Sequence, residues 1–511
     1  MQEKKNKTFV YIVGAGPGDP NLLTVKALDA LKKADVILYD RLVSQQILNY
    51  ANKKAEKVFV GKAPTKHRFP QEEINQLMLK YANEGKTIVR LKGGDPYIFG
   101  RGSEEALFLA EHKIPFEVIP GISAAIGASA YAGIPLTHRS LVTQVLFLTA
   151  HEDPSKPESQ LDLQNIAKMK NTTIVIYMGA AKLETLVEEL IKHGMSPNQT
   201  AAIVANATTA RQKTLTGKLV ELPEISRKNS LQPPLITIIS NCTRFAETLN
   251  WFERKPLFGK KIVVTRATDQ MQTIVSILTG EGAEIIPFPV FSTKSKPIED
   301  PKFTNFLAQN FDWIIFTSRN GVRYFMENLK DRQIKQFHTL KFAAIGEKTA
   351  EELQNYNLFA DFVPSAFNSD VFVDEFRRKF NLKKTRILRV KGTFENDPIT
   401  KILKAECKKY ETIDVYEIAK ENPNKNEIQN LLNSQADGII FTAPITVKYF
   451  FDIVGEKEAI SFLNKTKVFS IGPMTENALK SKGIENTYSS KLHTIEGIIN
   501  LMKEIFALEE K

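Results

Sequence analysis

The chain has 511 residues, enough for three or four compact units of roughly 100–200 residues each. With 42% apolar and 25% charged residues, its composition is that of a globular protein, which excludes a disordered or fibrous chain. No apolar run approaches the ~18–20 residues of a membrane span, and no signal peptide precedes the first predicted strand. Only Cys242 and Cys407 are present, so no disulfide framework and no metal site built on cysteines is expected. We expect a soluble cytoplasmic protein without a membrane partner.

The formal net charge of +11 has two functional interpretations. It is compatible with a nucleic-acid-binding protein or with a small polyanionic substrate, although Lys-rich surfaces are also common without either. Blocks of five or more like charges, zinc-finger spacings and aromatic-basic RNA-binding signatures are all missing from the sequence. We therefore expect no nucleic-acid partner.

Short apolar runs alternate with helical patterns along the whole chain. Strands are predicted at 9–13, 35–39, 87–91, 145–149, 173–178, 235–240, 262–265, 313–317, 342–345, 386–390, 438–442 and 467–471. Many of these runs are continuously apolar, as expected for parallel strands covered on both faces. The predicted fold class is α/β.

A domain boundary is predicted at 250–259, where Pro256 and Gly259 interrupt the pattern before a new strand. The second half contains an internal repeat. Residues 313–318 resemble 438–443 at an offset of 125 residues, and 342–346 resemble 469–472 at an offset of 126. Offsets of this length predict two similar α/β lobes rather than a solenoid, and a cleft between such lobes is the default ligand site.

The first glycine-rich loop, Gly14-Ala-Gly-Pro-Gly-Asp19, follows the first strand. One interpretation is a dinucleotide-binding loop for NAD, with Asp40 holding a ribose. That fold needs a third glycine where Asp19 stands, close to a pyrophosphate. A carboxylate at this position disfavours an anionic diphosphate, so NAD is the weaker interpretation.

Two further glycine clusters follow later strands, at 92–102 and 118–125, with Ser123 as a candidate helix cap. All three loops are predicted at the carboxyl ends of parallel strands, where open α/β sheets bind ligands. A single loop of this kind is more often a tight turn, but three on successive units indicate a site.

The N-terminal half resembles uroporphyrinogen-III C-methyltransferase, a tetrapyrrole methylase. The resemblance covers about 8–252 and rests on Gly14–Asp19, Tyr39-Asp-Arg-Leu-Val-Ser44, Val60-Gly-Lys62, Pro70–Asn75, Leu91-Lys-Gly-Gly-Asp-Pro-Tyr-Ile-Phe-Gly-Arg-Gly102 and Ala132–Arg139. It implies two α/β subdomains, about 8–138 and 142–245, and a cleft that binds S-adenosyl-L-methionine. It also implies methylation of uroporphyrinogen III at C2 and C7 to precorrin-2, and a homodimer formed through this half.

The same resemblance assigns roles to individual residues. Asp40 corresponds to the proton acceptor and Lys62 to the proton donor, although Asp40 could instead hold a loop and Lys62 could only bind a carboxylate. Arg41, Lys62, His67, Arg68, Arg101 and Arg139 are candidate partners of the substrate carboxylates. The cofactor contacts correspond to Pro17, Gly93, Gly94, Asp95, Ile98, Ser123, Ala124, Met178 and Ala207. Family members often have glycine at the last position, so a contact there that needs a positive φ is disfavoured by Ala207.

The C-terminal half has no P-loop, no Gly-x-Ser-x-Gly elbow and no His/carboxylate metal spacing. It resembles uroporphyrinogen-III synthase through Lys261–Arg266, Phe316–Gly321, Ala344–Gly346, Val415–Glu417 and Phe469–Gly472. The resemblance implies an outer lobe of 257–287 plus 420–511 and an inserted lobe of 293–414. The lobes would be joined by a two-stranded linker near 288–291 and 415–418.

In that family hydroxymethylbilane is cyclised with loss of water, and the enzyme chiefly holds the chain in a folded pose. Tyr416 corresponds to a tyrosine that assists the leaving hydroxyl, although it could equally pack in the linker for stability. Substrate contacts are expected at Thr317, Ser318, Thr349, Thr442 and Thr475.

The sequence thus predicts a fusion enzyme of domains 8–252 and 257–511 that makes precorrin-2 from hydroxymethylbilane, for sirohaem or cobalamin. The alternatives are an RNA or diphthamide methyltransferase of the same family fused to a two-lobe binding domain, and a nucleic-acid-binding protein.

Overall fold

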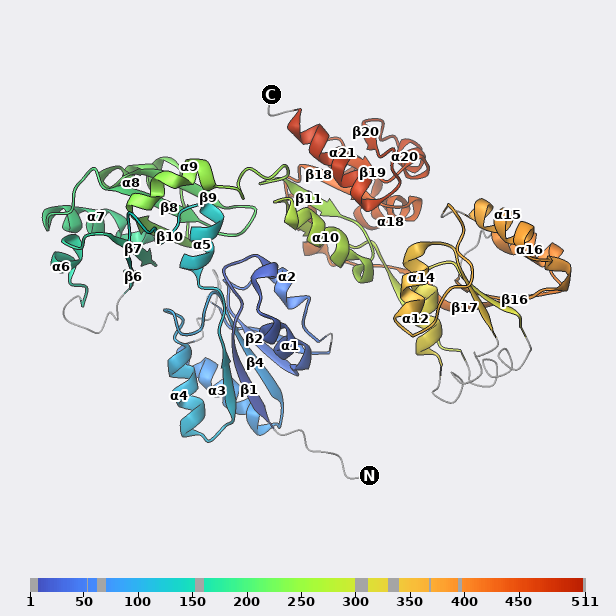
Figure 1. Ribbon diagram of the computed structural model, residues 1–511, viewed down its shortest axis with the longest axis horizontal. Helices are drawn as coiled ribbons and strands as arrows, with labels where there is room; N and C mark the ends of the chain where they lie inside the picture. Colours follow the sequence, from blue (N-terminus) through green and yellow to red (C-terminus); the bar gives the residue numbers. More distant parts are fainter. Residues whose placement is uncertain are drawn as a thin grey trace. The chain divides into compact units, whose positions relative to one another are not determined.

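The structure is a computed structural model that describes residues 8–52, 54–61, 70–151, 160–298, 311–329, 340–366, 369–393 and 398–508 (Figure 1). The chain divides into two compact units, one of residues 1–261, 277–284 and 503–511 and one of residues 262–276 and 285–502. Four five-stranded sheets are flanked by helices. The predicted α/β class is confirmed.

The first sheet is parallel throughout. Its order is β3-β2-β4-β1-β5, built from β1 (Phe9–Gly14), β2 (Val36–Tyr39), β3 (Glu56–Phe59), β4 (Thr87–Lys92) and β5 (Phe116–Ile119). One face packs on α1 (Val25–Lys33) and α2 (Gln45–Leu48), the other on α3 (Gln71–Asn83) and α4 (Gly102–Glu111) (Figure 1). Because all five strands point the same way, the loops that follow them share one edge.

The second sheet is mixed, which the continuous apolar runs did not predict. Its order is β6-β7-β10-β8-β9, with β6 (Gln144–Thr149), β7 (Thr172–Tyr177), β8 (Thr200–Ala205), β9 (Lys213–Lys218) and β10 (Leu235–Ile239). β6 and β7 are parallel, whereas β10 runs antiparallel to both of its neighbours. The helices of this region are α5 (Ala124–Ala132), α6 (Leu163–Ala167), α7 (Leu183–Lys192), α8 (Leu222–Lys228) and α9 (Ala246–Leu249). β10 is buried on both faces, between α5 on one side and α7 and α8 on the other, so its run is apolar although its pairing is antiparallel.

The third sheet has the order β12-β11-β18-β19-β20, in which β11, β18, β19 and β20 are parallel. Its strands are β11 (Lys261–Val264), β12 (Glu284–Pro287), β18 (Gly438–Phe441), β19 (Lys467–Ser470) and β20 (Thr487–Ser489). Its helices are α10 (Met271–Gly280), α17 (Lys425–Leu432), α18 (Pro444–Val454), α19 (Glu456–Leu463), α20 (Pro473–Lys480) and α21 (Ile495–Ala507).

The fourth sheet has the order β13-β17-β16-β14-β15 and lies between α12 and α14 on one face and α15 and α16 on the other (Figure 1). Its strands are β13 (Phe291–Ser295), β14 (Trp313–Phe316), β15 (Lys341–Ala344), β16 (Arg386–Gly392) and β17 (Lys409–Lys420). The helices are α12 (Arg319–Glu327), α14 (Glu347–Gln354), α15 (Ser369–Lys379) and α16 (Pro398–Glu406). The predicted two-stranded linker is the antiparallel pair of β13 with the end of β17, from Phe291 opposite Lys420 to Ser295 opposite Tyr416.

The internal repeat is confirmed in the backbone. β14 pairs in parallel with β15, as β18 does with β19, and each pair is followed by a glycine that begins a helix. The equivalent hydrogen bonds are Ile345 N to Phe316 O and Ile471 N to Phe441 O, then Thr349 N to Gly346 O and Thr475 N to Gly472 O. The predicted boundaries of the domains and lobes stay predictions.

Within the described ranges no helix is long and apolar enough to cross a membrane. The same residues contain no group of three or more His, Cys, Asp or Glu side chains that could hold a metal ion.

Asp312 ties two strands of the fourth sheet together. Its carboxylate accepts hydrogen bonds from the backbone N of Arg386 at 2.8 Å and from the Arg386 guanidinium at 2.7 Å. The guanidinium hydrogen bond holds the pKa of Asp312 below its usual value. Because the folded pKa is depressed, this contact stabilises the fold above the ordinary Asp pKa and is lost as the pH falls through the folded pKa.

We therefore expect Asp312→Asn to lower the free energy of unfolding at neutral pH by less than about 1 kcal/mol, since a half-exposed ion pair is screened by solvent. The difference from the unsubstituted protein should shrink at acid pH, below the ordinary Asp pKa of about 3.9, and vanish once the carboxylate is protonated in the folded protein. Urea titrations at neutral and at acid pH measure it. Asp374→Asn, which breaks the exposed pair with Arg377 on α15, is the control and should change stability less.

Candidate functional site

Three glycine loops meet at the carboxyl edge of the first sheet. Gly16 follows β1 and exchanges backbone hydrogen bonds with Gly94, which follows β4, at 3.2 and 2.7 Å. A Cβ on Gly14 would lie 2.5 Å from Gly121 N and 2.7 Å from Gly94 O, so the loop after β5 joins the other two. Glycine is therefore required at Gly14 and Gly121 by the close approach of backbones, whereas at Gly16 and Gly94 it is favoured by positive φ angles of 76° and 69°.

Asp95 holds the second and third loops in place. Its carboxylate accepts hydrogen bonds from Gly121 N at 3.1 Å and from Tyr97 N at 2.8 Å. The neighbouring Gly93 lies against Leu42, whose Cβ would be 2.7 Å from a Cβ built on the glycine. The loop therefore has a fixed shape without help from a ligand.

The first loop does not continue directly into a helix. A short 3-10 turn, Pro20–Leu22, follows Asp19, and α1 begins only at Val25, where Thr24 caps it. A dinucleotide fold needs the helix N-terminus directly after the glycines, facing the pyrophosphate. The Asp19 carboxylate caps the turn and accepts the Tyr131 hydroxyl at 2.7 Å, so it packs against α5. This hydrogen bond adds to the effect of burial, and both raise the pKa of Tyr131.

The second subdomain closes one side of the glycine loops. Ser123 lies at the N-cap position of α5, but its side chain does not cap the helix as predicted. Its hydroxyl instead lies 2.5 Å from the Tyr177 hydroxyl, which also accepts Ala125 N at 3.1 Å. Burial raises the pKa of Tyr177. Met178 follows it with a left-handed backbone (φ 54°), and Ala124 begins α5.

Pro17 and Ala207 are also at this junction. Pro17 packs on α5, where a Cβ on Gly127 would come within 2.5 Å of the proline Cγ. Ala207 stands between Asn206 and Thr208, which have positive φ angles of 48° and 67°. Ala207 itself has an ordinary φ, so alanine fits here without backbone strain.

The predicted proton acceptor, Asp40, directly follows β2 and lies beside these loops. Its Oδ1 accepts Leu42 N at 3.1 Å, and its side chain is 27% exposed. Arg41 is exposed next to it, and Arg139 is exposed in the turn between the two subdomains. Arg101, which has a positive φ of 57°, is paired with Glu104 at 2.6 Å. The predicted Lys62, His67 and Arg68 lie outside the described residues.

A buried charged cluster lies behind Asp40, and sequence reasoning did not find it. Glu105 Oε1 accepts Arg90 Nε at 3.0 Å, Lys92 Nζ at 2.8 Å and Gln71 Nε2 at 2.9 Å. Burial opposes ionisation of Glu105, but Arg90 and Lys92 outweigh it and hold the pKa of Glu105 below its usual value. Burial and the neighbouring Arg90 lower the pKa of Lys92. The sequence did hold one sign of this cluster, because Arg90 and Lys92 are two charged residues in the otherwise largely apolar strand β4.

Apolar side chains are exposed around the same edge. The ring of Phe99 contacts that of Tyr177 at a centroid distance of 5.0 Å. The exposed members are Leu42, Tyr97, Ile98, Phe99 and Met178, with exposed fractions of 38–54%. An exposed apolar group next to a polar, preformed backbone site is typical of a binding surface.

In the inserted lobe the predicted residues gather at the carboxyl end of the fourth sheet. The Tyr416 hydroxyl lies 3.1 Å from Ser318 Oγ, which also caps α12 by accepting Gly321 N. Tyr416 is buried and stacks on Tyr324. Thr349 is buried in the first turn of α14, and Thr317 is half-buried after β14.

The outer lobe has the equivalent arrangement without the tyrosine. Thr442 is half-buried after β18, and Thr475 is buried in the first turn of α20. Ala443 stands where the inserted lobe has Ser318, so the serine of the hydroxyl pair has no counterpart at this position of the outer lobe.

Comparisons with known proteins match the N-terminal and C-terminal halves of the chain to two different families. Residues 9–223 match the family Tetrapyrrole (Corrin/Porphyrin) Methylases, and residues 272–500 match Uroporphyrinogen-III synthase HemD. The chain is 34% identical to "Porphyrin biosynthesis protein HemD" of Ruminiclostridium josui over 97% of its own length and 98% of that protein's. The chain belongs to both families.

Other relatives match one part of it. The chain is 38% identical to "Uroporphyrinogen-III C-methyltransferase" of Bacillus subtilis, over 68% of this chain and 71% of that protein. It is 48% identical to "Siroheme synthase" of Nitrosomonas europaea over 48% of this chain and 50% of that protein. A solved uroporphyrin-III C-methyltransferase of Thermus thermophilus shares 39% identity, covers 46% of this chain and 98% of its own, and gives a TM-score of 0.40.

The protein is thus an enzyme that joins a uroporphyrinogen-III C-methyltransferase half to a uroporphyrinogen-III synthase half. The glycine loops, the buried cluster and the apolar rim all belong to the methyltransferase half. Tyr416 and Ser318 belong to the synthase half.

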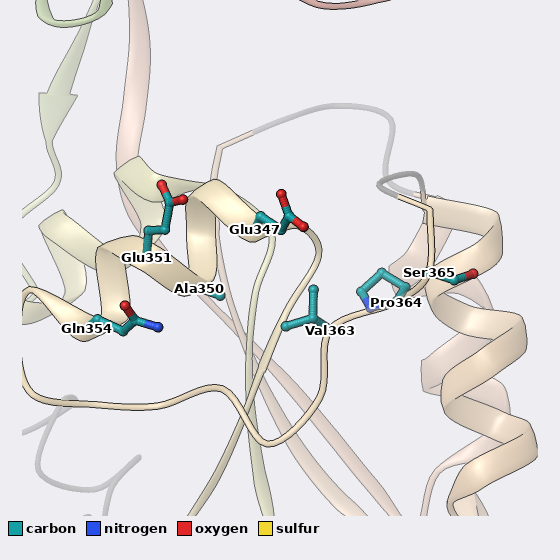
Figure 2. Close-up of a pocket in the computed structure, with 7 residues that line it drawn as sticks. All are labelled: Glu347, Ala350, Glu351, Gln354, Val363, Pro364 and Ser365. Carbon is teal, nitrogen blue, oxygen red and sulfur yellow. The ribbon is translucent and has the colours of Figure 1, made fainter.

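A pocket on the synthase half is not part of either predicted site. It lies between α14 and residues 363–365, has a volume of about 430 Å³ and is bordered by the carboxylates of Glu347 and Glu351 (Figure 2). Figure 2 shows both carboxylates extending from α14 on the same side. Two carboxylates repel a substrate that itself carries carboxylates, so this pocket does not suit one.

Gly121→Ala tests the close approach of the loops. The new Cβ would overlap Gly94 O and lie 2.8 Å from Gly14 Cα, so at least one loop must move. We expect a loss of about 1–3 kcal/mol in stability and at least tenfold weaker binding of S-adenosylhomocysteine, measured by calorimetry. Gly280→Ala is the control, because a Cβ there meets no atom within 4 Å. Unchanged affinity in Gly121→Ala would mean that the loops do not form the cofactor site.

Proposed function

We propose that the methyltransferase half transfers methyl groups from S-adenosyl-L-methionine to C2 and C7 of uroporphyrinogen III, giving precorrin-2. The meeting of three glycine loops after β1, β4 and β5 carries this proposal. The backbone there is bare and already shaped, and the first loop is followed by a 3-10 turn instead of an α-helix N-terminus, which suits a cationic sulfonium better than a diphosphate. The residues proposed to hold the cofactor are Pro17, Gly93, Gly94, Asp95, Ile98, Ser123, Ala124, Met178 and Ala207.

The cofactor supplies an electrophilic methyl group, and the residues of the chain handle the substrate and its proton. Methylation of a pyrrole carbon leaves a cationic ring that must lose a proton. Asp40 lies at the exposed edge of the site with its Oδ1 accepting Leu42 N, and this supports Asp40 as the acceptor of that proton. The proposed proton donor is Lys62, which the resemblance alone supports.

The exposed apolar rim suits the faces of the pyrrole rings, and basic side chains suit their carboxylates. We propose Arg41, His67, Arg68, Arg101 and Arg139 as these partners. Arg101 would exchange Glu104 for a substrate carboxylate, and this exchange costs little because an exposed ion pair contributes only about 0–1 kcal/mol. We further infer from the family resemblance that the protein is a homodimer through this half, which sedimentation can test.

We propose that the synthase half makes uroporphyrinogen III from hydroxymethylbilane. Loss of the hydroxyl leaves a stabilised cation, so holding the chain in a closed pose is the main requirement. The Tyr416 hydroxyl, which lies next to Ser318 Oγ, is the group we propose to hydrogen-bond the leaving hydroxyl. Thr317, Thr349, Thr442 and Thr475 add further hydroxyls at the equivalent ends of two sheets. The relatives named siroheme synthase support sirohaem as the end product.

Incubation of the whole chain with hydroxymethylbilane tests both reactions. Without S-adenosyl-L-methionine we expect uroporphyrinogen III alone, and with it the dimethylated product, both identified by mass and absorbance. Methylation of an RNA or a protein, with no effect on hydroxymethylbilane, would support the alternative methyltransferase.

Asp40→Asn should lower the rate of methylation of supplied uroporphyrinogen III by about 10²–10⁴-fold at saturating cofactor, because the amide cannot accept the ring proton. Affinity for S-adenosylhomocysteine should stay within about threefold, and cyclisation of hydroxymethylbilane should be unchanged. Asp35→Asn is the matched control: Asp35 precedes the same strand and its carboxylate accepts Thr87 N at the opposite end of the sheet. A loss below about threefold in Asp40→Asn would reduce Asp40 to a structural role.

A further inference from the structure

The charged cluster behind Asp40 follows from the register of two neighbouring strands. Leu38 on β2 lies opposite Arg90 on β4, and Tyr39 lies opposite Leu91. Continuing this register by one residue places Asp40 next to Lys92. Side chains alternate along a strand, so Arg90, Lys92 and Asp40 share the face that packs on α3 and α4. At the carboxyl edge of the sheet, the apolar core on this face therefore gives way to charge.

The cluster holds two cations and two carboxylates. The side chains of Arg90, Lys92 and Glu105 are 4%, 5% and 0% exposed, whereas that of Asp40 is 27% exposed. Among these four groups, Asp40 is the one that reaches the surface of the site. Arg90, Lys92 and Glu105 are buried, so Asp40 is the member of the cluster that a substrate could contact.

Stability does not account for such a cluster. Buried ion pairs are often matched or exceeded in stability by apolar side chains of similar size. The arrangement is also incomplete: Arg90, Lys92 and Gln71 all donate to Glu105 Oε1, while the buried Oε2 has no hydrogen-bond partner among the described residues. A group kept at such a cost has a role beyond packing.

Arg90 connects the cluster to both strands of the site. Its Nη1 donates to Leu38 O at 3.4 Å and to Leu91 O at 3.2 Å, and its Nε donates to Glu105. Its Nη2 lies 3.9 Å from Asp40 Oδ2, while Leu42 N holds the other oxygen. The guanidinium is thus fixed on three sides and faces the carboxylate with its remaining nitrogen.

We propose that Arg90, held by Glu105, is a positioning residue for Asp40. It orients the carboxylate toward the substrate ring and keeps it in register with the glycine loop that begins two residues after Leu91. This inference rests on the proposed role of Asp40 as proton acceptor. Because a displacement of about 1 Å at a reacting group can cost about 10²-fold in rate, loss of the guanidinium should lower turnover more than binding.

The test measures methylation of supplied uroporphyrinogen III by the full chain. For Arg90→Met we expect kcat to fall by about 10–100-fold, while KM and the affinity for S-adenosylhomocysteine stay within about threefold. Arg90→Lys should recover part of the rate, since it restores the charge but not the fork of hydrogen bonds. Lys86→Met is the matched control and should leave kcat unchanged, because Lys86 pairs with Glu84 at the opposite end of β4.

Combining Arg90→Met with Asp40→Asn separates this inference from the proposed function. If Arg90 acts through Asp40, adding Arg90→Met to Asp40→Asn should lower kcat by less than about twofold more. A full further loss in that background, or a kcat within threefold of the unsubstituted protein for Arg90→Met alone, overturns the inference. Full activity of Asp40→Asn alone would instead refute Asp40 as the acceptor. If Arg90→Met does not fold, Arg90→Lys is compared in both backgrounds by the same criteria.

Discussion

The methyltransferase half depends on the approach of three backbones without side chains between them. Gly14, Gly94 and Gly121 end or follow three neighbouring parallel strands and lie so close that a Cβ on Gly14 or Gly121 would overlap another loop. This contact brings Asp95 within reach of Gly121 N, which in turn fixes the start of α5 and so the position of Ser123. The second subdomain reaches the same point through Tyr177 and Thr208. A surface made of backbone is thereby formed before any ligand arrives, which would reduce the ordering that binding of the proposed cofactor requires.

The glycine loops need positions without side chains, whereas the neighbouring part of the same sheet edge is filled by the buried charged side chains of Arg90, Lys92 and Glu105. Carboxyl ends of parallel strands present carbonyl oxygens, and Arg90 satisfies two of them, Leu38 O and Leu91 O. An arginine there needs a buried anion, which Glu105 provides from α4. The edge is therefore divided between a bare glycine surface, proposed to bind the cofactor, and a charged cluster, proposed to position Asp40.

Most of the strands that were predicted from sequence lie in the interior of a sheet, where burial on both faces produces a continuous apolar run. Apolar runs such as Val36–Tyr39 and Gly438–Phe441 are central parallel strands, and the offset repeat identified both lobes of the synthase half. Strands at sheet edges were missed because one face is solvated: Glu56–Phe59 and Lys213–Lys218 carry too few apolar residues to stand out. The Ala-rich β8 was missed although it is almost fully buried, because alanine favours helices more than strands.

The candidate site also contains residues that the sequence predicted and residues that it did not. The glycine loops were found because glycine in three successive turns is visible in sequence and parallel strands place those turns at one edge. Glu105 was not found, because its partners Arg90 and Lys92 lie on a different element and only packing brings them together. The same holds for Ser123, whose sequence position predicts a cap but whose hydroxyl bonds Tyr177 across the subdomain junction. A local pattern predicts local geometry, whereas the partner of a buried polar group is decided by tertiary contacts.

The synthase half shows how a duplicated scaffold can acquire an asymmetric site. The two lobes share strand pairing, the glycine before each helix and the buried threonine in its first turn. They differ where Ser318 caps α12 and Ala443 stands at the equivalent position before α18. The hydrogen bond between Tyr416 and Ser318 therefore has no counterpart at Ala443. If the proposed roles hold, polar assistance to a leaving group would come from the inserted lobe and the shared threonines would hold the substrate, a division that suits a reaction needing a pose more than a nucleophile.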